Sequence, residues 1–186
     1  MQKISSKPGL ANFYSQSPPE IKDYFGELPG LLSGGFSFDV LLAYVFARLE
    51  LAHVNCLYCG VVKLHNVDSG LAMRAIQQFH MTRSGFREKY SVVYGEPISK
   101  EVISLHTFAE GVRDAVLHGK QGSDDNKRNA IAHVLEYAKG LNEHTVSLEG
   151  PKPFGDLRGF KGARQALSKE TSRWVLQGMG FFAQKI

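Results

Sequence analysis

Apolar residues recur at helical spacing in successive segments of this 186-residue chain. A period of three to four residues places such side chains on one face of an α-helix, and that face must pack against another element. We find no convincing pair of strand patterns before Val146. The chain is therefore predicted to be all-α, with an up-and-down helical bundle as its core. The expected helices cover residues 36–66, 69–80, 84–94, 99–117 and 123 to at least 141.

The two ends of the chain differ from this core in composition. Residues 1–35 are rich in Pro and Gly, which predicts an irregular N-terminal arm with one short helix, capped by Ser17 and begun by the two prolines that follow it. Residues 36–144 are predicted to form the helical domain. Residues 145–186 are predicted to form a basic, aromatic-containing C-terminal extension.

The segment RDAVLHG, residues 113–119, ends the predicted helix 99–117 and is followed by the polar run KQGSDDN. Arginine keeps its charge and can grip a phosphate through two parallel hydrogen bonds, whereas histidine can exchange a proton near neutral pH. Gly119 can end the helix in a left-handed conformation, which leaves His118 on a terminal turn. We therefore predict that Arg113 and His118 carry phosphodiester chemistry. Lys120 is a candidate for a further phosphate contact.

An Arg, four further residues, a His and a Gly together resemble the signature of the HEPN superfamily of small helical RNA-cleaving domains. Arg113, Asp114, His118 and Gly119 carry this resemblance, and Asp114 stands where that family more often has Asn. The resemblance covers at most residues 36–144, and in the family the motif lies near the junction with the last core helix. The predicted layout places RDAVLHG at that junction too.

The resemblance to HEPN domains implies a metal-independent endoribonuclease without a cofactor. His118 would assist attack of an RNA 2′-hydroxyl on the adjacent phosphorus, and Arg113 would hold the phosphate. The products would end in a 2′,3′-cyclic phosphate, and DNA would not be cut. The resemblance further implies a homodimer in which two Arg and His pairs face one cleft, and a toxin or phage-defence role with an antitoxin or other protein as partner.

Two further pairs share the Arg-x4-His spacing, namely Arg48 with His53 and Arg128 with His133. A step of five residues turns about 140° around a continuous helix, so both side chains of such a pair do not share a face. Arg128 and His133 are the second candidate, because Arg128 is followed by Asn as in the HEPN pattern. His133 is followed by Val rather than Gly, which predicts a helix that continues.

Basic residues are concentrated at the C-terminal end. Residues 1–150 hold 15 Lys and Arg against 16 Asp and Glu, whereas residues 151–186 hold 7 against 2. Aromatic rings at 154, 160 and 174 are interleaved with this charge, as in surfaces that bind single-stranded nucleic acid. The candidate RNA contacts are Arg158, Lys161, Arg164 and Arg173. The alternative is a tail that packs through its aromatic rings and keeps its charges in solvent.

Other functions also fit this sequence. A helical module that dimerises or binds a partner without cleavage is one alternative, because Asp114 would repel a phosphate and tend to hold His118 protonated. An ion pair between Arg113 and an acid such as Glu110 would explain the arginine without catalysis. A nucleic-acid-binding adaptor that acts through the C-terminal segment alone is a third possibility.

Cys56 and Cys59 form a CxxC motif between His53 and His65. A zinc site needs four ligands that converge as a tetrahedron, and a continuous helix would turn His65 away from the other three. We therefore predict no metal site and two small buried residues, with zinc and a redox dithiol as the alternatives.

The sequence predicts a cytoplasmic protein without a membrane segment. The longest apolar stretch, residues 40–64, is interrupted by Arg48, Glu50 and His53, which are costly in a bilayer. Residues 1–10 lack the apolar core of a secretory signal.

Overall fold

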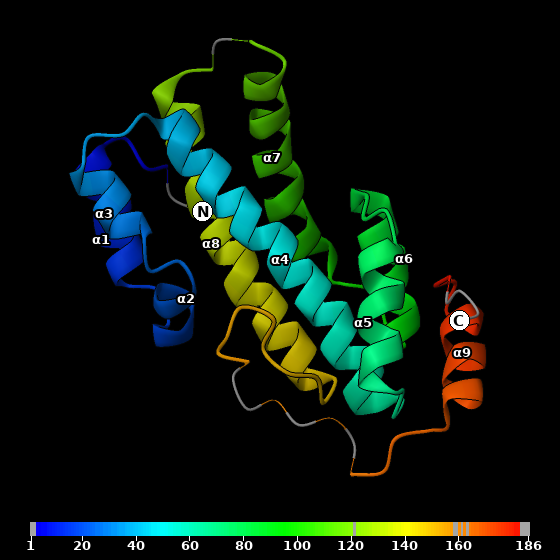
Figure 1. Cartoon of the computed structure of the whole chain (residues 1–186). Helices are drawn as coiled ribbons and strands as arrows, with labels where there is room; N and C mark the ends of the chain where they lie inside the picture. The colour runs from blue at the N-terminus through cyan, green and yellow to red at the C-terminus, as the bar shows by residue number, and fades with distance from the viewer. Residues whose placement is uncertain (1–2, 121, 158–159, 161, 163, 183–186) are drawn as a thin grey trace. The chain divides into compact units, whose positions relative to one another are not determined.

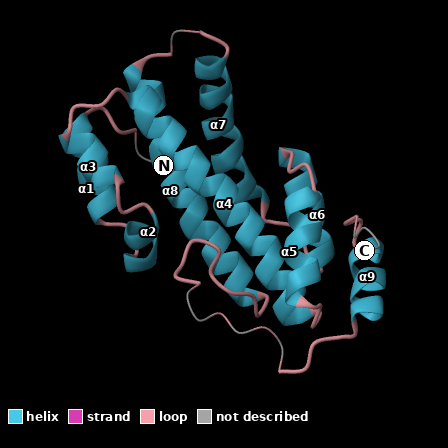
Figure 2. Cartoon of the chain, in the orientation of Figure 1, coloured by secondary structure: helices cyan, strands magenta, loops and turns pink. Residues whose placement is uncertain are grey.

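The computed structural model describes residues 3–120, 122–157, 160, 162 and 164–182. Within these residues the backbone forms nine helices and no strand, so the all-α prediction is confirmed (Figure 1, Figure 2). The helices are α1 (Lys7–Ser15), α2 (Pro19–Tyr24), α3 (Leu28–Ser33), α4 (Phe38–Leu64), α5 (Ser69–Gln78), α6 (Arg83–Tyr94), α7 (Lys100–Leu117), α8 (Asp124–Ser147) and α9 (Lys169–Gly178). The up-and-down arrangement of the core stays a prediction.

The chain forms two compact units. Unit 1 comprises residues 1–50, 99–141 and 154–156, and unit 2 comprises residues 51–98, 142–153 and 157–186. The first part of α4, α7 and most of α8 belong to unit 1, together with α1 to α3. The rest of α4, the end of α8, and α5, α6 and α9 belong to unit 2.

The five helices expected from the periodic pattern correspond to α4 through α8. Serine caps begin two of them: Ser99 Oγ accepts from Val102 N at 3.3 Å, and Ser123 Oγ accepts from Asn126 N at 3.2 Å. Each cap satisfies one of the amide groups that has no partner within the first helical turn.

The expectation of an irregular N-terminal arm is wrong for residues 7–33, which form three short helices. Prolines 8, 19 and 29 each lie in the first two positions of one of these helices. A proline there loses no hydrogen bond and already has a helical φ, so these residues begin helices rather than break them. The expected cap is also wrong. Pro18 occupies that position, and the Ser17 hydroxyl donates to Phe13 O at 3.4 Å.

Helices α7 and α8 run antiparallel in unit 1 (Figure 1). The ring of His106 stacks on Tyr137 with centroids 4.7 Å apart, and the ring of Phe108 lies 4.3 Å from His133. The contacts move backward along α8 as they move forward along α7, which is the register of an antiparallel pair. The end of α7 and the beginning of α8 therefore lie at the same end of this pair.

Phe154 anchors the segment after α8 in the core of unit 1. Its side chain is fully buried, and its ring lies 5.2 Å from Tyr24, 5.9 Å from Phe25 and 6.3 Å from Tyr137. Burying an aromatic ring of this size is among the largest single contributions a side chain makes to a core. The predicted C-terminal extension thus contains a residue that belongs to the core of unit 1.

Unit 2 includes a helix that the sequence analysis did not predict. Ser168 Oγ caps α9 by accepting from Thr171 N at 3.1 Å. Ser172 Oγ accepts from Asp68 N at 3.0 Å, which ties α9 to the beginning of α5. The capping serine and the apolar residues Leu176 and Met179 were the signals of this helix.

Within the described part of the chain, α4 is the helix long and apolar enough to cross a membrane by length and composition. Half of its most apolar window is buried, and the core helix of a soluble protein passes the same test. This is weak evidence for a membrane segment, and the cytoplasmic location stays a prediction.

Candidate functional site

The C-terminal end of α7 carries the first candidate pair, and its geometry follows from Gly119. Gly119 has a φ of +71°, which places it in the left-handed region that glycine adopts without strain. Its N–H donates to Val116 O at 3.0 Å, and Lys120 N donates to Ala115 O at 2.9 Å. These two bonds make the Schellman ending of a helix. The predicted left-handed end of this helix is therefore confirmed, and it leaves His118 at the C-cap, exposed to solvent.

Arg113 lies in the last two turns of α7 and is held by α4. Its Nη2 is 2.9 Å from Glu50 Oε1, with 30% of the Arg113 side chain and 60% of the Glu50 side chain exposed. The guanidinium carbon lies 5.2 Å from the ring centroid of Phe46. This arginine therefore combines an ion pair and a cation–π contact at a partly open position.

An ion pair of Arg113 was anticipated, but with a different acid. Glu110 is buried and lies 3.4 Å from His106 Nε2 within α7. The acid that meets Arg113 is Glu50, 63 residues earlier in the chain. Asp114 Oδ1 is 3.9 Å from Arg113 Nη1, so this guanidinium faces two carboxylates.

No hydrogen bond between described residues joins Arg113 to His118. Arg113 points to α4, whereas His118 and Lys120 are exposed beyond the last helical turn. The two candidates therefore share one end of α7 without forming a preassembled pair. A ligand that contacted both would approach from solvent at this end.

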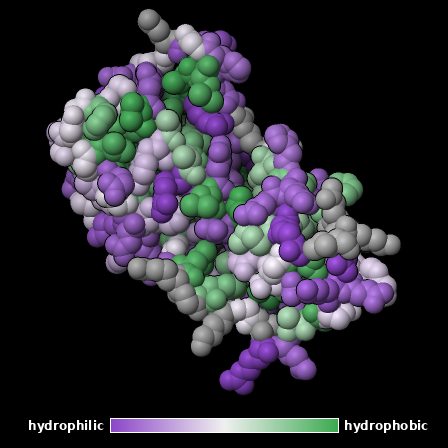
Figure 3. Space-filling view, viewed as in Figure 1, coloured by the Kyte–Doolittle hydropathy of each residue, from purple (hydrophilic) through white to green (hydrophobic). Residues whose placement is uncertain are grey.

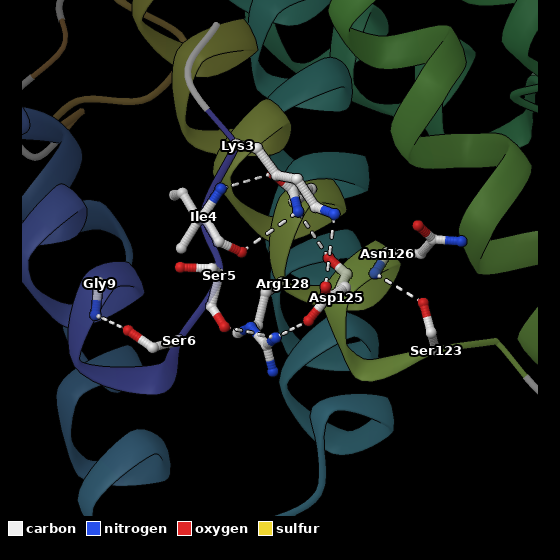
Figure 4. A network of polar contacts seen from close by, with 10 residues as sticks. Lys3, Ile4, Ser5, Ser6, Gly9, Ser123, Asp125, Asn126 and Arg128 are labelled. Carbon is white, nitrogen blue, oxygen red and sulfur yellow. Dashed lines mark hydrogen bonds and ion pairs between the residues drawn. The ribbon is translucent and has the colours of Figure 1, made fainter.

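The second candidate pair lies on α8, and its arginine is structural. Arg128 is 8% exposed. As Figure 4 shows, it forms an ion pair with the Asp125 carboxylate, and its Nη2 donates to Ser5 O at 3.0 Å. Its guanidinium carbon also lies 5.2 Å from the ring centroid of Phe38. Its Nε is buried and donates to no described residue. Arg128 thus holds the segment before α1 against α8.

Asn129, which follows it, completes this attachment. Its Oδ1 accepts from Ile4 N at 2.9 Å, and its Nδ2 donates to Ile4 O at 3.3 Å and to Asp125 O at 2.7 Å. The amide side chain pairs with both polar groups of one backbone residue, as a neighbouring strand would. The Arg-Asn dipeptide that matches the HEPN pattern therefore has a structural task in this chain.

His133 is the better oriented of the two candidate histidines. Its Nδ1 lies 2.7 Å from Asn129 O, and its ring packs on Phe108. A carbonyl oxygen only accepts, so Nδ1 carries the proton of this bond, and Nε2 is the basic nitrogen of the neutral ring. The side chain is half-buried. His118 forms no comparable bond to a described residue.

The predicted RNA contacts are only partly within the described residues. Arg158 and Lys161 lie outside them. Arg164 is exposed, and Arg173 on α9 is half-buried with an Nε that donates to no described residue. Of the three aromatic rings, Phe154 is buried and Phe160 lies 6.2 Å from the ring of Tyr58, whereas Trp174 keeps 64% of its surface exposed. Trp174 is therefore the ring best placed to stack on a base.

Cys56 and Cys59 are buried free thiols. Burial raises the pKa of both to about 12. His53 stacks on Phe86 with centroids 3.7 Å apart, and His65 Nε2 lies 2.7 Å from Val93 O. Across the described residues, no group of three or more His, Cys, Asp or Glu side chains is arranged to hold a metal ion.

Comparison of the chain with protein-family models, curated proteins and solved structures gave no match. Membership of the HEPN superfamily therefore stays an expectation that depends on the local motif and the helical layout.

Proposed function

We propose that this protein is a metal-independent endoribonuclease of HEPN type that uses Arg113 and His118. The observation that carries this proposal is the end of α7, where an exposed histidine follows a partly open arginine within two helical turns. Helix α9 in the C-terminal extension, which carries the exposed ring of Trp174, would add RNA-binding area. We also propose the cytoplasm as its location and toxin or phage-defence activity as its context.

The reaction follows from the two side chains. His118 removes the proton of a ribose 2′-hydroxyl, whose oxygen attacks the adjacent phosphorus, and the bond to the 5′-oxygen of the next nucleotide breaks. The Arg113 guanidinium binds the phosphate oxygens and stabilises their developing charge. The leaving oxygen takes a proton, and the 5′ fragment ends in a 2′,3′-cyclic phosphate. The mechanism uses proton transfer and charge stabilisation only.

Phosphate must displace Glu50 for this reaction to occur. An ion pair between side chains as exposed as these contributes about 0.2–1 kcal/mol, whereas a two-pronged arginine–phosphate contact is charge-assisted and stronger. The exchange is therefore favourable when RNA is bound. Glu50 would then hold the arginine in place between substrates.

A second pair, Arg128 and His133, is supported by the orientation of its histidine. The bond from Nδ1 to Asn129 O fixes the tautomer that a general base requires. Its arginine would have to leave Asp125 and Ser5 before it could bind phosphate, and this would detach the segment before α1. We therefore rank this pair second.

A second function, a helical module that binds RNA or a protein partner without cleavage, is favoured by the same ion pair that occupies Arg113. Under this alternative, Glu50 and Arg113 join α4 to α7 and no exchange with phosphate takes place.

Cleavage of end-labelled RNA by purified protein in EDTA separates these proposals. Under the leading proposal, His118→Ala lowers the single-turnover rate by about 10²- to 10⁴-fold, and His133→Ala cleaves at nearly the wild-type rate. Arg113→Ala is similarly damaging, and Arg113→Lys restores part of the rate because it keeps the charge but not the fork. A 2′-deoxy nucleotide at the cleaved position should block cleavage there.

If His133→Ala loses RNA cleavage and His118→Ala does not, the catalytic site lies on α8 instead. Equal background degradation by wild type and both histidine variants, all of which melt cooperatively, would contradict the ribonuclease proposal for that RNA panel. In that case the binding module is the function to pursue, and salt-dependent RNA binding by wild type would identify it.

A further inference from the structure

A cavity lies between α1 and α3, entirely within unit 1. Its volume is about 290 Å³, it is partly open to solvent, and residues of both helices line it. Small-molecule sites are mostly apolar cavities of about this size or larger. A dry apolar cavity of about 150 Å³ is known to bind benzene, so this cavity has room for a larger apolar group.

The walls of the cavity are apolar and held in place. Pro8 and Pro29 line it, and each lies in the first two positions of its helix, where the ring fixes φ. Leu32 is 5% exposed, and the Tyr14 hydroxyl donates to Lys22 O at 2.7 Å, which fixes the position of the Tyr14 ring in the wall. Walls that are already ordered lose little freedom when a ligand binds. The cavity is therefore suited to hold an apolar group without rearrangement.

The polar groups of the lining select the charge of a ligand. Among the described residues that line the cavity, Lys7 is the one charged side chain, and none is acidic. Lys7 is half-buried and forms no ion pair with a described residue. The Ser33 hydroxyl donates to Gly30 O at 3.1 Å, so its proton is already used. An apolar cavity with a single cation at its edge is complementary to an apolar molecule with a single negative charge.

We propose that this cavity binds a free medium-chain fatty acid, whose carboxylate contacts Lys7 and whose chain lies between α1 and α3. The lining extends from Lys7 to Tyr14, seven positions or about 10 Å along α1. Carbon–carbon single bonds are about 1.5 Å long, so an extended chain of about eight carbons covers this length. Octanoate is therefore the probe of choice.

The surroundings of the cavity favour a small ligand over a partner protein. Asn12, Ser15 and Gln16 are exposed polar residues of α1 beside the lining. Figure 3 shows hydrophobic side chains among polar ones in the region that α1 and α3 occupy in Figure 1. A fatty acid that enters the cavity leaves these polar groups in water, whereas a partner protein would cover them at a cost in desolvation.

Titration of the isotope-labelled full chain with sodium octanoate, followed by NMR, tests the site directly. The amide signals of Ala11 and Leu32 should shift and saturate, with a dissociation constant of about 0.1–1 mM for a ligand of this size. The indole N–H of Trp174, an exposed ring of unit 2, reports non-specific apolar binding and should not shift. Octylammonium has the same chain with a positive head, and it should bind at least about tenfold more weakly than octanoate.

Chain length provides a second measurement. Each buried methylene strengthens binding by up to about fourfold, so hexanoate should bind up to about 15-fold more weakly than octanoate. Decanoate should gain little over octanoate, because its additional carbons extend beyond the cavity.

The charge of Lys7 is tested by Lys7→Gln. This variant should lose the preference for octanoate over octylammonium, whereas Lys7→Arg should keep it. Lys100→Gln is the matched control, because Lys100 is also the first residue of its helix, and it should bind octanoate as wild type does.

The cavity itself is tested by Ala11→Leu, which fills it from α1. Position 11 is exposed and leucine is a good helix former, so the variant should keep the fold. Its affinity for octanoate should fall at least about tenfold. Ala43→Leu makes the same change at an exposed alanine of α4 and should bind as wild type does.

Four results would overturn the proposal. They are octanoate that shifts no amide of α1 or α3 at about ten times the expected dissociation constant, equal affinity for octylammonium, affinity that keeps rising through decanoate, and an Ala11→Leu protein that binds as wild type does. Binding to phosphatidylglycerol vesicles without a response to free octanoate would also overturn it, and would identify a membrane surface as the occupant. None of these measurements uses RNA. A protein that binds octanoate but cleaves no RNA contradicts the ribonuclease proposal alone.

Discussion

The left-handed turn that ends α7 can be tested with two glycine substitutions. Gly119 has a φ of +71°, and a Cβ placed on it meets no atom within 4 Å, so alanine there adds backbone strain without a clash. Such strain is about 1–2 kcal/mol for an L-residue. Restricting the unfolded chain returns about 0.4–1 kcal/mol. We therefore expect Gly119→Ala to lower the free energy of unfolding by about 0.5–1 kcal/mol.

Gly111 provides the matched control within the same helix. A Cβ on Gly111 also meets no atom within 4 Å, but its φ is not in the left-handed region. Alanine is favoured over glycine in a helix interior by about 0.8–1 kcal/mol, so Gly111→Ala should stabilise the protein. The two variants should differ by about 1.3–2 kcal/mol, or about 3–8 °C in Tm for a chain of this size.

Urea denaturation followed by circular dichroism measures this difference. If Gly119→Ala is as stable as wild type, or more stable, the left-handed ending of α7 is not held as described. The same pair tests the site, because the turn at Gly119 sets the direction of the His118 ring. Gly119→Ala should cleave RNA more slowly than Gly111→Ala at saturating substrate.

Three further predictions concern charge, stacking and the thiols. Glu50→Gln should release Arg113 and tighten RNA binding in low salt. Glu143→Gln makes the same charge change at an exposed position of unit 2 and should have a smaller effect. Equal effects of the two variants in filter binding would contradict the exchange of Glu50 for phosphate at Arg113. Trp174→Ala should weaken RNA binding by about 1–3 kcal/mol without slowing bound-state cleavage, and unchanged affinity would remove α9 from the RNA surface. Burial raises the pKa values of the two cysteines from 9.0 to about 12. The unfolded chain therefore loses these protons at a lower pH than the folded protein does, and the free energy of unfolding should fall between pH 9 and pH 12. Replacing both with alanine should flatten that part of a stability-against-pH curve.

The long helices could be predicted because their signals are local. The serine caps at 99 and 123 and the apolar stripe that follows each of them lie within a few turns of the residues they organise. The helix end at Gly119 was predictable for the same reason. The short N-terminal helices were not predicted because proline interrupts a helix in its interior but favours a helix at its first positions. Only the position of the proline relative to the first turn distinguishes the two cases.

The partners of the candidate site could not be predicted from sequence. Glu50 is 63 residues from Arg113, and Ser5 is 123 residues from Arg128. Periodicity indicates which face of a helix is buried, but it does not indicate which residue of another helix lies opposite. The structural role of Asn129 could not be predicted either. Its side chain forms hydrogen bonds with the backbone of Ile4, and a backbone group has no sequence signature.

The attachment of Ile4 to Asn129 also has a consequence for synthesis on the ribosome. The two residues are 125 positions apart. Translation at about 5–20 residues per second makes the second partner about 6–25 s after the first. During that interval Ile4, which is 7% exposed in the finished protein, has no α8 to bind. The segment around Ile4 is thus secured only after α8 has been made, and a nascent chain stopped before α8 would present this segment and the core residues of α4 to chaperones and proteases.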